Sequence, residues 1–355
     1  MKKINQSKPV LVTGATGYVA GWLVKRLLDE GVTVHAAVRD PGNKEKVAHL
    51  EEMANGSKGK IKFFSSDLLK EGSYAEAMEG CELVFHTASP FTSNFKDPQK
   101  DLIDPAVLGT RNVLEQANQT GTVKRVVLTS SCAAIYTDCT DIENTPEGIL
   151  TEEVWNETAS LEYQPYSYSK TLAEKEAWKM HDEQSGWDLV VINPCMVLGP
   201  AHNLRSGTSE SITILKQMGD GTTRMGAPKL GIGVVDVRDV AEAHYLAGFT
   251  PEAEGRHITC ARGTDFLEIA QSLIPKYGKD YPIPKNAIPK WLLMLVGPMI
   301  NKSLNRRFIR NNVNCEWKAD NSKSREKLGL TYRSLKETMN DSFQQLIDQG
   351  IVNKK

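Results

Sequence analysis

The chain has 355 residues, and its 43 Lys and Arg almost balance its 44 Asp and Glu, giving a formal net charge of −1. A nucleic-acid partner requires clustered Lys and Arg, and the sequence holds no such cluster, so none is expected. The longest apolar block, at residues 291–296, is much shorter than the ~20 residues that span a bilayer. No signal-peptide pattern follows the first lysines. We therefore expect a cytoplasmic protein with no membrane partner.

Six cysteines are spread along the chain without the paired spacing of a zinc site or a redox motif. Cysteines of this kind mostly behave as small buried apolar residues. The sequence therefore predicts reduced thiols and no metal site.

Short apolar runs alternate with amphipathic runs through the first half of the chain. The apolar runs predict strands at residues 10–12, 32–38, 61–64, 83–86 and 126–129. The amphipathic runs between them predict helices at residues 18–30, 43–54, 74–79 and 107–119. Apolar strands that alternate with helices indicate a parallel sheet covered on both faces. The expected fold is α/β, a doubly wound parallel sheet of the Rossmann type.

The second half of the chain is less regular. A helix is predicted at residues 166–184 and a strand at 189–192. We expect a first domain of residues 1–193, rejoined by a segment at about 234–250, because the strand and helix pattern returns there. Residues 194–233 and 251–355 then form a smaller, mainly helical substrate-binding lobe. The apolar block at 291–296 is predicted to be a helix over the substrate cleft, in the core or at a dimer face.

The predicted first strand leads directly into Thr13-Gly14-Ala15-Thr16-Gly17-Tyr18-Val19-Ala20. In a dinucleotide-binding turn, the first glycine permits the turn, the second lets the backbone approach a pyrophosphate, and a small third residue lets the helix pack. Gly14, Gly17 and Ala20 fill these positions, and the following helix offers free N–H groups to the phosphates. A purely structural turn is the alternative, but a strand before and a helix after favour dinucleotide binding.

The end of the second strand bears on the choice of cofactor. NAD enzymes usually place Asp or Glu there, whereas Arg accommodates the 2′-phosphate of NADP. The strand ends at Arg39 and Asp40, with Lys44 and Lys46 close behind. Arg39 favours NADPH because a guanidinium binds phosphate oxygens as a fork. Asp40 argues the other way, and the two lysines fit a solvated helix face almost equally well.

Other polar and small residues follow the third and fourth strands. Asp67 is either an acceptor for the adenine amino group or a helix N-cap. Thr87, Ala88 and Ser89 are small enough to let a cofactor lie close. His86 is interpreted as structural and is not nominated as catalytic.

Tyr166 and Lys170 are four residues apart in a predicted helix and so share one face. A free phenol, with a pKa of about 10, is a poor acid at neutral pH. A nearby ammonium stabilises the phenolate and lowers that pKa toward the working range. The pair follows the fifth strand, which favours a catalytic pair over a chance Tyr-x-x-x-Lys. Tyr163 and Tyr168 are rival phenols, but Tyr168 faces elsewhere.

The fifth strand ends at Thr129-Ser130-Ser131. Hydroxyls at the carboxyl edge of parallel strands lie at the ligand-binding end of the sheet. One of them can hold a substrate oxygen while charge develops on it. Ser130 and Ser131 point to opposite faces, so the residues alone do not decide between them.

Together, Thr-Gly-x-x-Gly-x-x-Ala, Val-Arg-Asp-Pro, Asp67-Leu68, the Thr-Ser-Ser triplet and Tyr166 with Lys170 resemble the extended short-chain dehydrogenase/reductase superfamily. Within it, the chain is similar to the dihydroflavonol 4-reductase and cinnamoyl-CoA reductase group, which includes microbial aldehyde and ketone reductases. The likeness extends to Leu328-Gly329 and covers nearly the whole chain.

This resemblance implies roles for individual residues. The family's catalytic serine falls on Ser131, which completes a triad with Tyr166 and Lys170, and hydride would pass from NADPH to a carbonyl. The 2′-phosphate contacts fall on Arg39 and Lys46. The expected cofactor-binding residues are Thr13, Gly14, Thr16, Gly17, Tyr18, Val19, Arg39, Lys46, Asp67, Leu68, Thr87, Ala88, Ser89, Tyr166, Lys170, Pro194 and Val197.

Departures from the family pattern limit the substrate. Tyr136 stands where dihydroflavonol reductases carry an Asn that contacts the flavonoid, and Gln164-Pro165 replaces the Asn-Trp of the cinnamoyl-CoA group. We therefore expect a small or medium, fairly apolar aldehyde or ketone, contacted by Pro90, Cys132 and Tyr136. A monomer or a homodimer is expected.

Two other classes share this scaffold. A sugar-nucleotide epimerase/dehydratase or a hydroxysteroid-type dehydrogenase/isomerase is the main alternative, although epimerases favour an acidic residue where Arg39 stands. A non-catalytic dinucleotide sensor is the more remote one, since such proteins tend to lose the Tyr and Lys pair.

Overall fold

Seven parallel strands form the main sheet of the computed structural model, which describes residues 2–89, 95–204, 210–300 and 304–354. Their order across the sheet is β3-β2-β1-β4-β5-β6-β9. The strands are β1 (Val10–Thr13), β2 (Thr33–Val38), β3 (Lys60–Ser65), β4 (Leu83–His86), β5 (Arg125–Thr129), β6 (Asp188–Pro194) and β9 (Gly255–Thr259). The order reverses between β1 and β4, where doubly wound sheets bind their ligands. The predicted Rossmann-type fold is confirmed.

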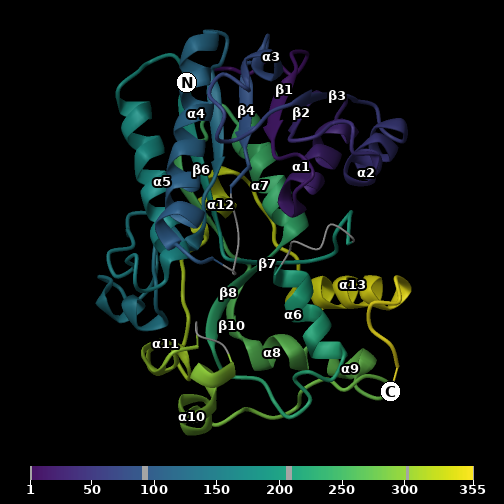
Figure 1. Cartoon of the computed structure of the whole chain (residues 1–355), viewed down its shortest axis with the longest axis vertical. Helices are drawn as coiled ribbons and strands as arrows, with labels where there is room; N and C mark the ends of the chain where they lie inside the picture. The colour runs from purple at the N-terminus through teal and green to yellow at the C-terminus, as the bar shows by residue number, and fades with distance from the viewer. Residues whose placement is uncertain (1, 90–94, 205–209, 301–303, 355) are drawn as a thin grey trace.

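Helices cover both faces of this sheet, as Figure 1 shows in its upper half. On one face, α1 (Tyr18–Asp29), α2 (Lys44–Asn55) and α7 (Val237–Phe249) share an apolar core with β1 and β2. On the other, α3 (Ala75–Met78), α4 (Asp104–Thr120) and α5 (Pro165–Asp182) pack against β4, β5 and β6. All four residues of β1 and of β4 are buried, which explains why their sequences are apolar up to the last residue, Thr13 or His86.

A smaller lobe lies below the main sheet in Figure 1. It is built on a three-stranded sheet with the order β10-β8-β7, made of β10 (Arg262–Asp265), β8 (Gly231–Asp236) and β7 (Met196–Leu198). Its helices are α6 (Glu210–Gly219), α8 (Phe266–Gln271), α9 (Ile274–Tyr277), α10 (Lys290–Ile300), α11 (Arg306–Asn312) and α13 (Leu335–Asp348). A second core, which includes Leu215, Tyr277 and Phe343, holds α6, α9 and α13 together.

The chain crosses between the two sheets more often than the domain division expected from the sequence. β9 pairs with β6 in the main sheet, although the sequence places its residues in the smaller lobe. Conversely, β8 begins the segment predicted to return to the first domain, yet it belongs to the smaller sheet. After α12 (Ser322–Lys327), Leu328 and Leu330 enter the core of the main sheet. Short strands with little periodicity do not reveal such crossings.

One prediction about the cysteines is wrong. Cys139 and Cys315 form a disulfide, with their Cα atoms 6.1 Å apart across a sequence separation of 176 residues. Cys81, Cys132, Cys195 and Cys260 are free and buried. Residues so distant along the chain meet only through the tertiary fold, so their spacing carries no signal of the bond.

The apolar block at residues 291–296 lies within α10, which packs on α11 through Leu293, Ile309 and Val313. Its outer side is open, since Trp291 is 68% and Leu295 60% exposed. In the described part of the chain, no helix combines the length and the apolar character needed to cross a membrane.

Candidate active site

The turn between β1 and α1 brings its backbone close to the end of β4. Gly14 has a φ of +63°, and a Cβ built on it would lie 3.1 Å from the Cα of Ala88. Only glycine combines this backbone conformation with so close an approach. The Gly17 N–H donates to the Gly14 carbonyl at 2.9 Å and closes the turn.

Thr13 ties the two strand ends together. Its hydroxyl oxygen accepts from the N–H groups of Thr87, at 3.1 Å, and Ala88, at 3.0 Å. The same oxygen lies 3.0 Å from the His86 Nδ1. Burial lowers the pKa of His86 to about 3, so this histidine is neutral. Its position agrees with the structural interpretation, and the bonds of Thr13 keep Thr87, Ala88 and Ser89 beside the glycine turn.

The N-terminus of α1 is arranged to receive an anion. Gly17 is the N-cap and provides no side-chain hydrogen bond, and the first turn holds no acidic residue. Within the described residues, the N–H groups of this turn therefore lack a side-chain cap, which is the condition that favours a phosphate at a helix start. Tyr18 turns its hydroxyl to the Gly199 carbonyl, at 2.6 Å, and so links the helix to the chain beyond β7.

The charged residues after β2 separate into two groups. Arg39 is exposed, whereas the Asp40 carboxylate accepts from the Gly42 N–H at 3.0 Å and stabilises the local turn. Lys44 pairs with Glu51 at 2.8 Å, and Lys46 is exposed in the first turn of α2. Asp40 therefore stabilises the backbone turn, and the contacts of the exposed Arg39 and Lys46 with a 2′-phosphate stay predictions.

Asp67 also stabilises its own turn. Its carboxylate accepts from the Leu69 N–H at 2.8 Å, which is close to the capping alternative. Leu68 packs against α4, where a Cβ on Gly109 would lie only 2.4 Å from the Leu68 Cγ. The structure thus gives both residues a local role, and the predicted contact of Asp67 with adenine remains a prediction.

Tyr166 and Ser131 meet at the carboxyl edge of the main sheet. Burial raises the pKa of the Tyr166 phenol to about 12, and a hydrogen bond with Ser131 opposes that rise. Ser130 faces away, because its hydroxyl donates to the Glu174 carboxylate. The geometry therefore separates the two serines that the strand sequence left open, and Ser131 is the one beside the phenol.

Lys170 is 8% exposed, one turn after Tyr166 on α5, with its ammonium 5.9 Å from the centre of the Tyr166 ring. It donates to the Ser89 hydroxyl at 3.0 Å. Burial lowers the pKa of Lys170 to about 8, and the charge of Glu174 opposes that fall. Tyr163, a rival phenol, donates instead to Asp138 at 2.8 Å.

The residues nominated for substrate contact adjoin an apolar cluster. Cys132 is buried, with its sulfur 3.1 Å from that of Cys195. The ring of Tyr136 meets the ring of Trp317 edge-on, with their centres 5.6 Å apart. Trp317 was missed from the sequence, since it lies in a late segment with no motif of its own. Pro90, the other nominated residue, lies outside the described residues.

Pro194 and Val197 flank the chain crossing from the main sheet to the smaller one. Pro194 is buried at the end of β6, and Val197 lies in β7. The Val197 carbonyl accepts from the Ser211 hydroxyl at 2.6 Å, at the start of α6. Both residues therefore belong to the connection between the lobes, and their place beside a cofactor stays a prediction.

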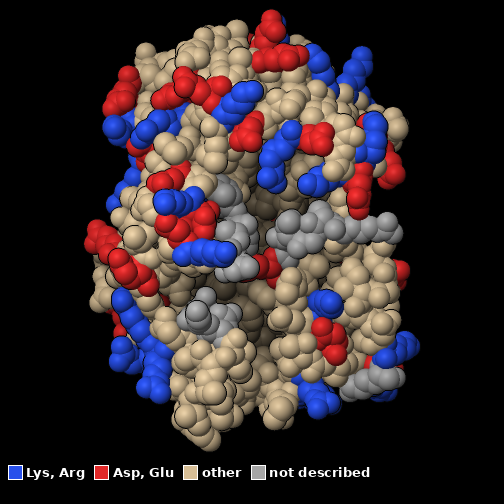
Figure 2. Space-filling model, in the orientation of Figure 1, with Lys and Arg blue, Asp and Glu red and all other residues tan. Residues whose placement is uncertain are grey.

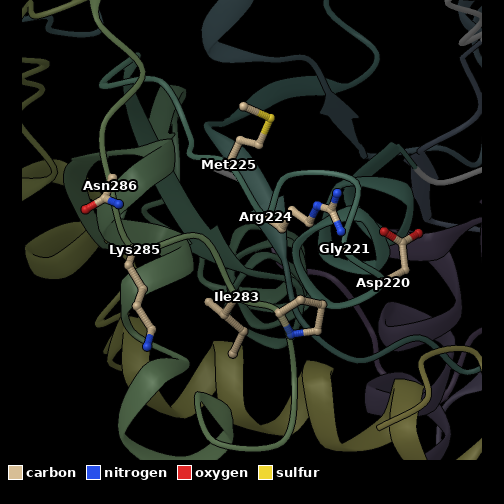
Figure 3. Close-up of a pocket in the computed structure, with 8 residues that line it drawn as sticks. Asp220, Gly221, Arg224, Met225, Ile283, Lys285 and Asn286 are labelled. Carbon is tan, nitrogen blue, oxygen red and sulfur yellow. The ribbon is translucent and has the colours of Figure 1, made fainter. Parts of the chain in front are cut away.

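Figure 2 shows a hollow between the upper and lower parts of the molecule, with Lys, Arg, Asp and Glu interspersed over this face. A separate pocket of about 700 Å³ lies in the smaller lobe, as Figure 3 shows. Its walls come from the loop after α6, including Arg224, and from residues around Lys285. None of the predicted site residues that the structure describes lines it.

Comparisons with known proteins agree with this geometry. A family model described as the NAD dependent epimerase/dehydratase family matches residues 10–261. Cinnamoyl-CoA reductase CAD2 of Medicago truncatula is 42% identical over 280 residues, which cover 78% of this chain and 83% of the relative. Tetraketide alpha-pyrone reductase 1 of Arabidopsis thaliana is 36% identical over 349 residues, 97% of each chain.

Solved structures extend the likeness to the whole fold. The yeast methylglyoxal/isovaleraldehyde reductase Gre2, complexed with NADPH, superimposes with a TM-score of 0.76 at 27% sequence identity. The superposition covers 97% of this chain and all of the other. The predicted resemblance to the cinnamoyl-CoA and dihydroflavonol reductase group is confirmed by these relatives and by Dihydroflavonol 4-reductase of Arabidopsis thaliana, at 34% identity.

Proposed function

Because the chain belongs to the NAD dependent epimerase/dehydratase family, we propose that it is an NADPH-dependent reductase of aldehydes or ketones. It would transfer hydride to the carbonyl carbon of a small or medium, fairly apolar substrate and release the alcohol. The observation that carries this proposal is the meeting of Tyr166, Lys170 and Ser131 at the carboxyl edge of the sheet, beside the glycine turn. Full-length similarity to reductases supports the same direction of reaction.

The residues around β1 and β2 fit NADP(H) as the cofactor. The uncapped first turn of α1 and the close approach of Gly14 to Ala88 suit a pyrophosphate. Arg39 and Lys46 would hold the 2′-phosphate, and Asp40 offers little competition because its carboxylate caps a turn. When bound, the cofactor supplies the hydride.

Three side chains would do the remaining chemistry. Ser131 would donate a hydrogen bond to the substrate oxygen, and Tyr166 would protonate that oxygen as hydride reaches carbon. Lys170, as an ammonium, would stabilise the phenolate that Tyr166 becomes. The burial that raises the pKa of Tyr166 to about 12 makes this positive charge necessary near neutral pH.

An apolar substrate is supported by the surroundings of the triad. Cys132, Cys195, Tyr136 and Trp317 belong to one apolar cluster that begins next to Ser131. Such a wall offers dispersion contacts and few charges for a phosphate or a CoA group to bind. The proposal also includes a cytoplasmic location and a monomeric or homodimeric state.

A screen of aldehydes and ketones with NADPH and NADH tests the proposal. We expect at least one carbonyl compound to cause oxidation of added NADPH, which is measured as the loss of NADPH absorbance. We also expect that no cofactor is carried through purification. An epimerase of the same family would instead retain NAD and leave added NADPH unchanged. NADPH binding without turnover of any compound in the panel would contradict the proposed activity.

A further inference from the structure

Glu174 follows Tyr166 and Lys170 along one face of α5, at intervals of four residues. Its carboxylate is fully buried, and the residue is 1% exposed. A buried carboxylate has a high cost in free energy unless charged and hydrogen-bonded partners surround it. Glu174 therefore requires an explanation that the proposed chemistry has not yet given.

Three polar side chains from neighbouring strands hold the Glu174 carboxylate, and the Trp178 indole of α5 itself donates to it more distantly, at 3.4 Å. Arg256 donates to one of its oxygens at 2.6 Å, and Asn193 donates to the other at 2.8 Å. The Ser130 hydroxyl donates to the same oxygen as Asn193. These donors come from β9, β6 and the end of β5, so the carboxylate joins α5 to three neighbouring strands.

Arg256 is itself fixed in place. It is 6% exposed, and its guanidinium donates to the carbonyls of Glu152, at 2.8 Å, and Val154, at 2.6 Å. The guanidinium also lies 4.0 Å from the centre of the Trp155 ring. Because these contacts fix the Arg256 guanidinium, they also fix the position of the Glu174 carboxylate that it binds.

The network reaches the catalytic residues by two routes. Asn193 also donates to the Ser131 carbonyl at 3.3 Å, so the backbone of Ser131 is tied to the partner of Glu174. Glu174 and Lys170 line one small cavity of about 10 Å³, together with His86, Ser89 and Thr129. Of the described residues that line this cavity, Glu174 is the only acidic one.

Among the other titratable groups described near this site, Glu210 in α6 acts on the Tyr166 phenol and raises its pKa, and the buried histidines add no negative charge. Burial lowers the pKa of His86, on β4, to about 3, and that of His244, on α7, to about 4, so both are neutral. His244 meets the Thr129 hydroxyl at 2.6 Å. Arg256 on β9 lies behind Glu174, and the Tyr166 phenol is uncharged. The Lys170 ammonium thus depends on Glu174 for a nearby countercharge.

We infer that Glu174 is a positioning residue for the proposed reaction, held by Arg256 and Asn193, which keeps Lys170 charged and Ser131 in place. The inference rests on the proposed function, in which Lys170 must be an ammonium. It predicts that the charges of Glu174 and Arg256 set the pH above which Lys170 becomes neutral and turnover falls.

Four proteins test how the charges of Glu174 and Arg256 affect Lys170: the wild type, Glu174→Gln, Arg256→Gln and the double variant. The measurement is kcat against pH with NADPH and a reducible carbonyl. We expect the high-pH limb of Glu174→Gln to move down by about one pH unit, because a countercharge is lost while Arg256 keeps its own. Arg256→Gln should move the limb up, and the double variant should lie between the wild type and Glu174→Gln.

A matched control separates this role from simple stabilisation. Asp239→Asn removes another buried carboxylate that pairs with an arginine, Arg333, in a different part of the chain. It should lower the melting temperature and leave the pH profile unchanged. If Glu174→Gln does the same, Glu174 is merely structural and the inference is wrong. If Glu174→Gln does not fold, an unchanged limb in Arg256→Gln would contradict the inference equally, because the loss of that positive charge should move the limb up.

A second readout keeps the inference apart from the proposed function. The titration of Lys170, followed by NMR of lysine labelled at its ε carbon, reports its pKa without any substrate. The Lys170 pKa should rank the four proteins in the same order as the high-pH limb of kcat does. Absence of carbonyl reduction by the wild type would contradict the proposed function, whereas equal Lys170 titrations in all four proteins would contradict the role of Glu174.

Discussion

Tyr166 is the residue whose loss should affect the reaction most. Tyr166→Phe removes the hydroxyl that would protonate the substrate oxygen and keeps the ring on α5, so kcat should fall by about a hundredfold or more. NADPH binding, measured by fluorescence titration, should remain. Tyr168→Phe removes a phenol from the same helix and should leave kcat near that of the wild type. Substantial turnover by Tyr166→Phe would remove Tyr166 from the proposed role.

Arg39 should discriminate between the two nicotinamide cofactors. Arg39→Ala should raise KM for NADPH by about tenfold or more, because a charge-assisted contact with the 2′-phosphate is lost. KM for NADH should change little. Lys44→Ala is the control, since Lys44 pairs with Glu51 in the structure. Equal effects of Arg39→Ala on both cofactors would place the phosphate elsewhere.

Single residues also mark how far the sequence could predict the site. Tyr166 and Lys170 were predicted from their spacing, because four residues make about one helical turn, together with their position after the fifth strand. The choice of Ser131 over Ser130 does not follow from strand alternation and rested on the family resemblance, and the coordinates add that Ser130 donates to Glu174. Glu174 and Arg256 are 82 residues apart and carry no motif, so their pairing was not predictable.

At the scale of elements, the apolar strands were predictable and the crossings between lobes were not. β1, β4 and β5 are buried on both faces, so their sequences are almost continuously apolar. β9, β8 and β10 are short and mixed in composition, and pairing with distant strands decides their place. A strand of five residues has too few positions for periodicity to assign it to one sheet.

The disulfide between Cys139 and Cys315 joins η3 (Cys139–Asn144) to the segment after α11. Thiol titration of denatured, unreduced protein should therefore detect four of the six cysteines, and reduction should release the other two. Cys139→Ser should give one more free thiol than the wild type before reduction, since Cys315 loses its partner. Cys260→Ser should give one fewer. A wild-type count of six without reductant would contradict the bond.

At the scale of the whole molecule, buried histidines should make stability depend on pH. Burial lowers the pKa of His86 and His257 to about 3, and that of His202 and His244 to about 4. The unfolded value is about 6.5, so the unfolded chain binds more protons below that pH. The stabilising contribution is complete above about pH 6.5 and is lost as pH falls toward the folded values.

Denaturant unfolding at two pH values measures this effect. Between about pH 6.5 and 5, each such histidine should reduce the free energy of unfolding by roughly 1–2 kcal/mol. His257→Leu should lose less free energy of unfolding over the same interval than the wild type, because it lacks one of these histidines. The carboxylates are the same in both proteins and do not contribute to the difference. An equal loss in the two proteins would mean that His257 titrates normally in the folded state.

The path of the chain through the two sheets has a consequence for synthesis. Leu328 and Leu330 pack in the same core as Val10 and Leu23. β9, at the edge of the main sheet, emerges only after β7, α6 and β8 of the smaller lobe. A nascent chain that folds its domains from the N-terminus onward cannot finish this one early. On the ribosome, the domain whose synthesis starts first should therefore be among the last to complete its folding. Until β9 is made, the edge of the sheet at β6 is unpaired, and a chaperone could bind there.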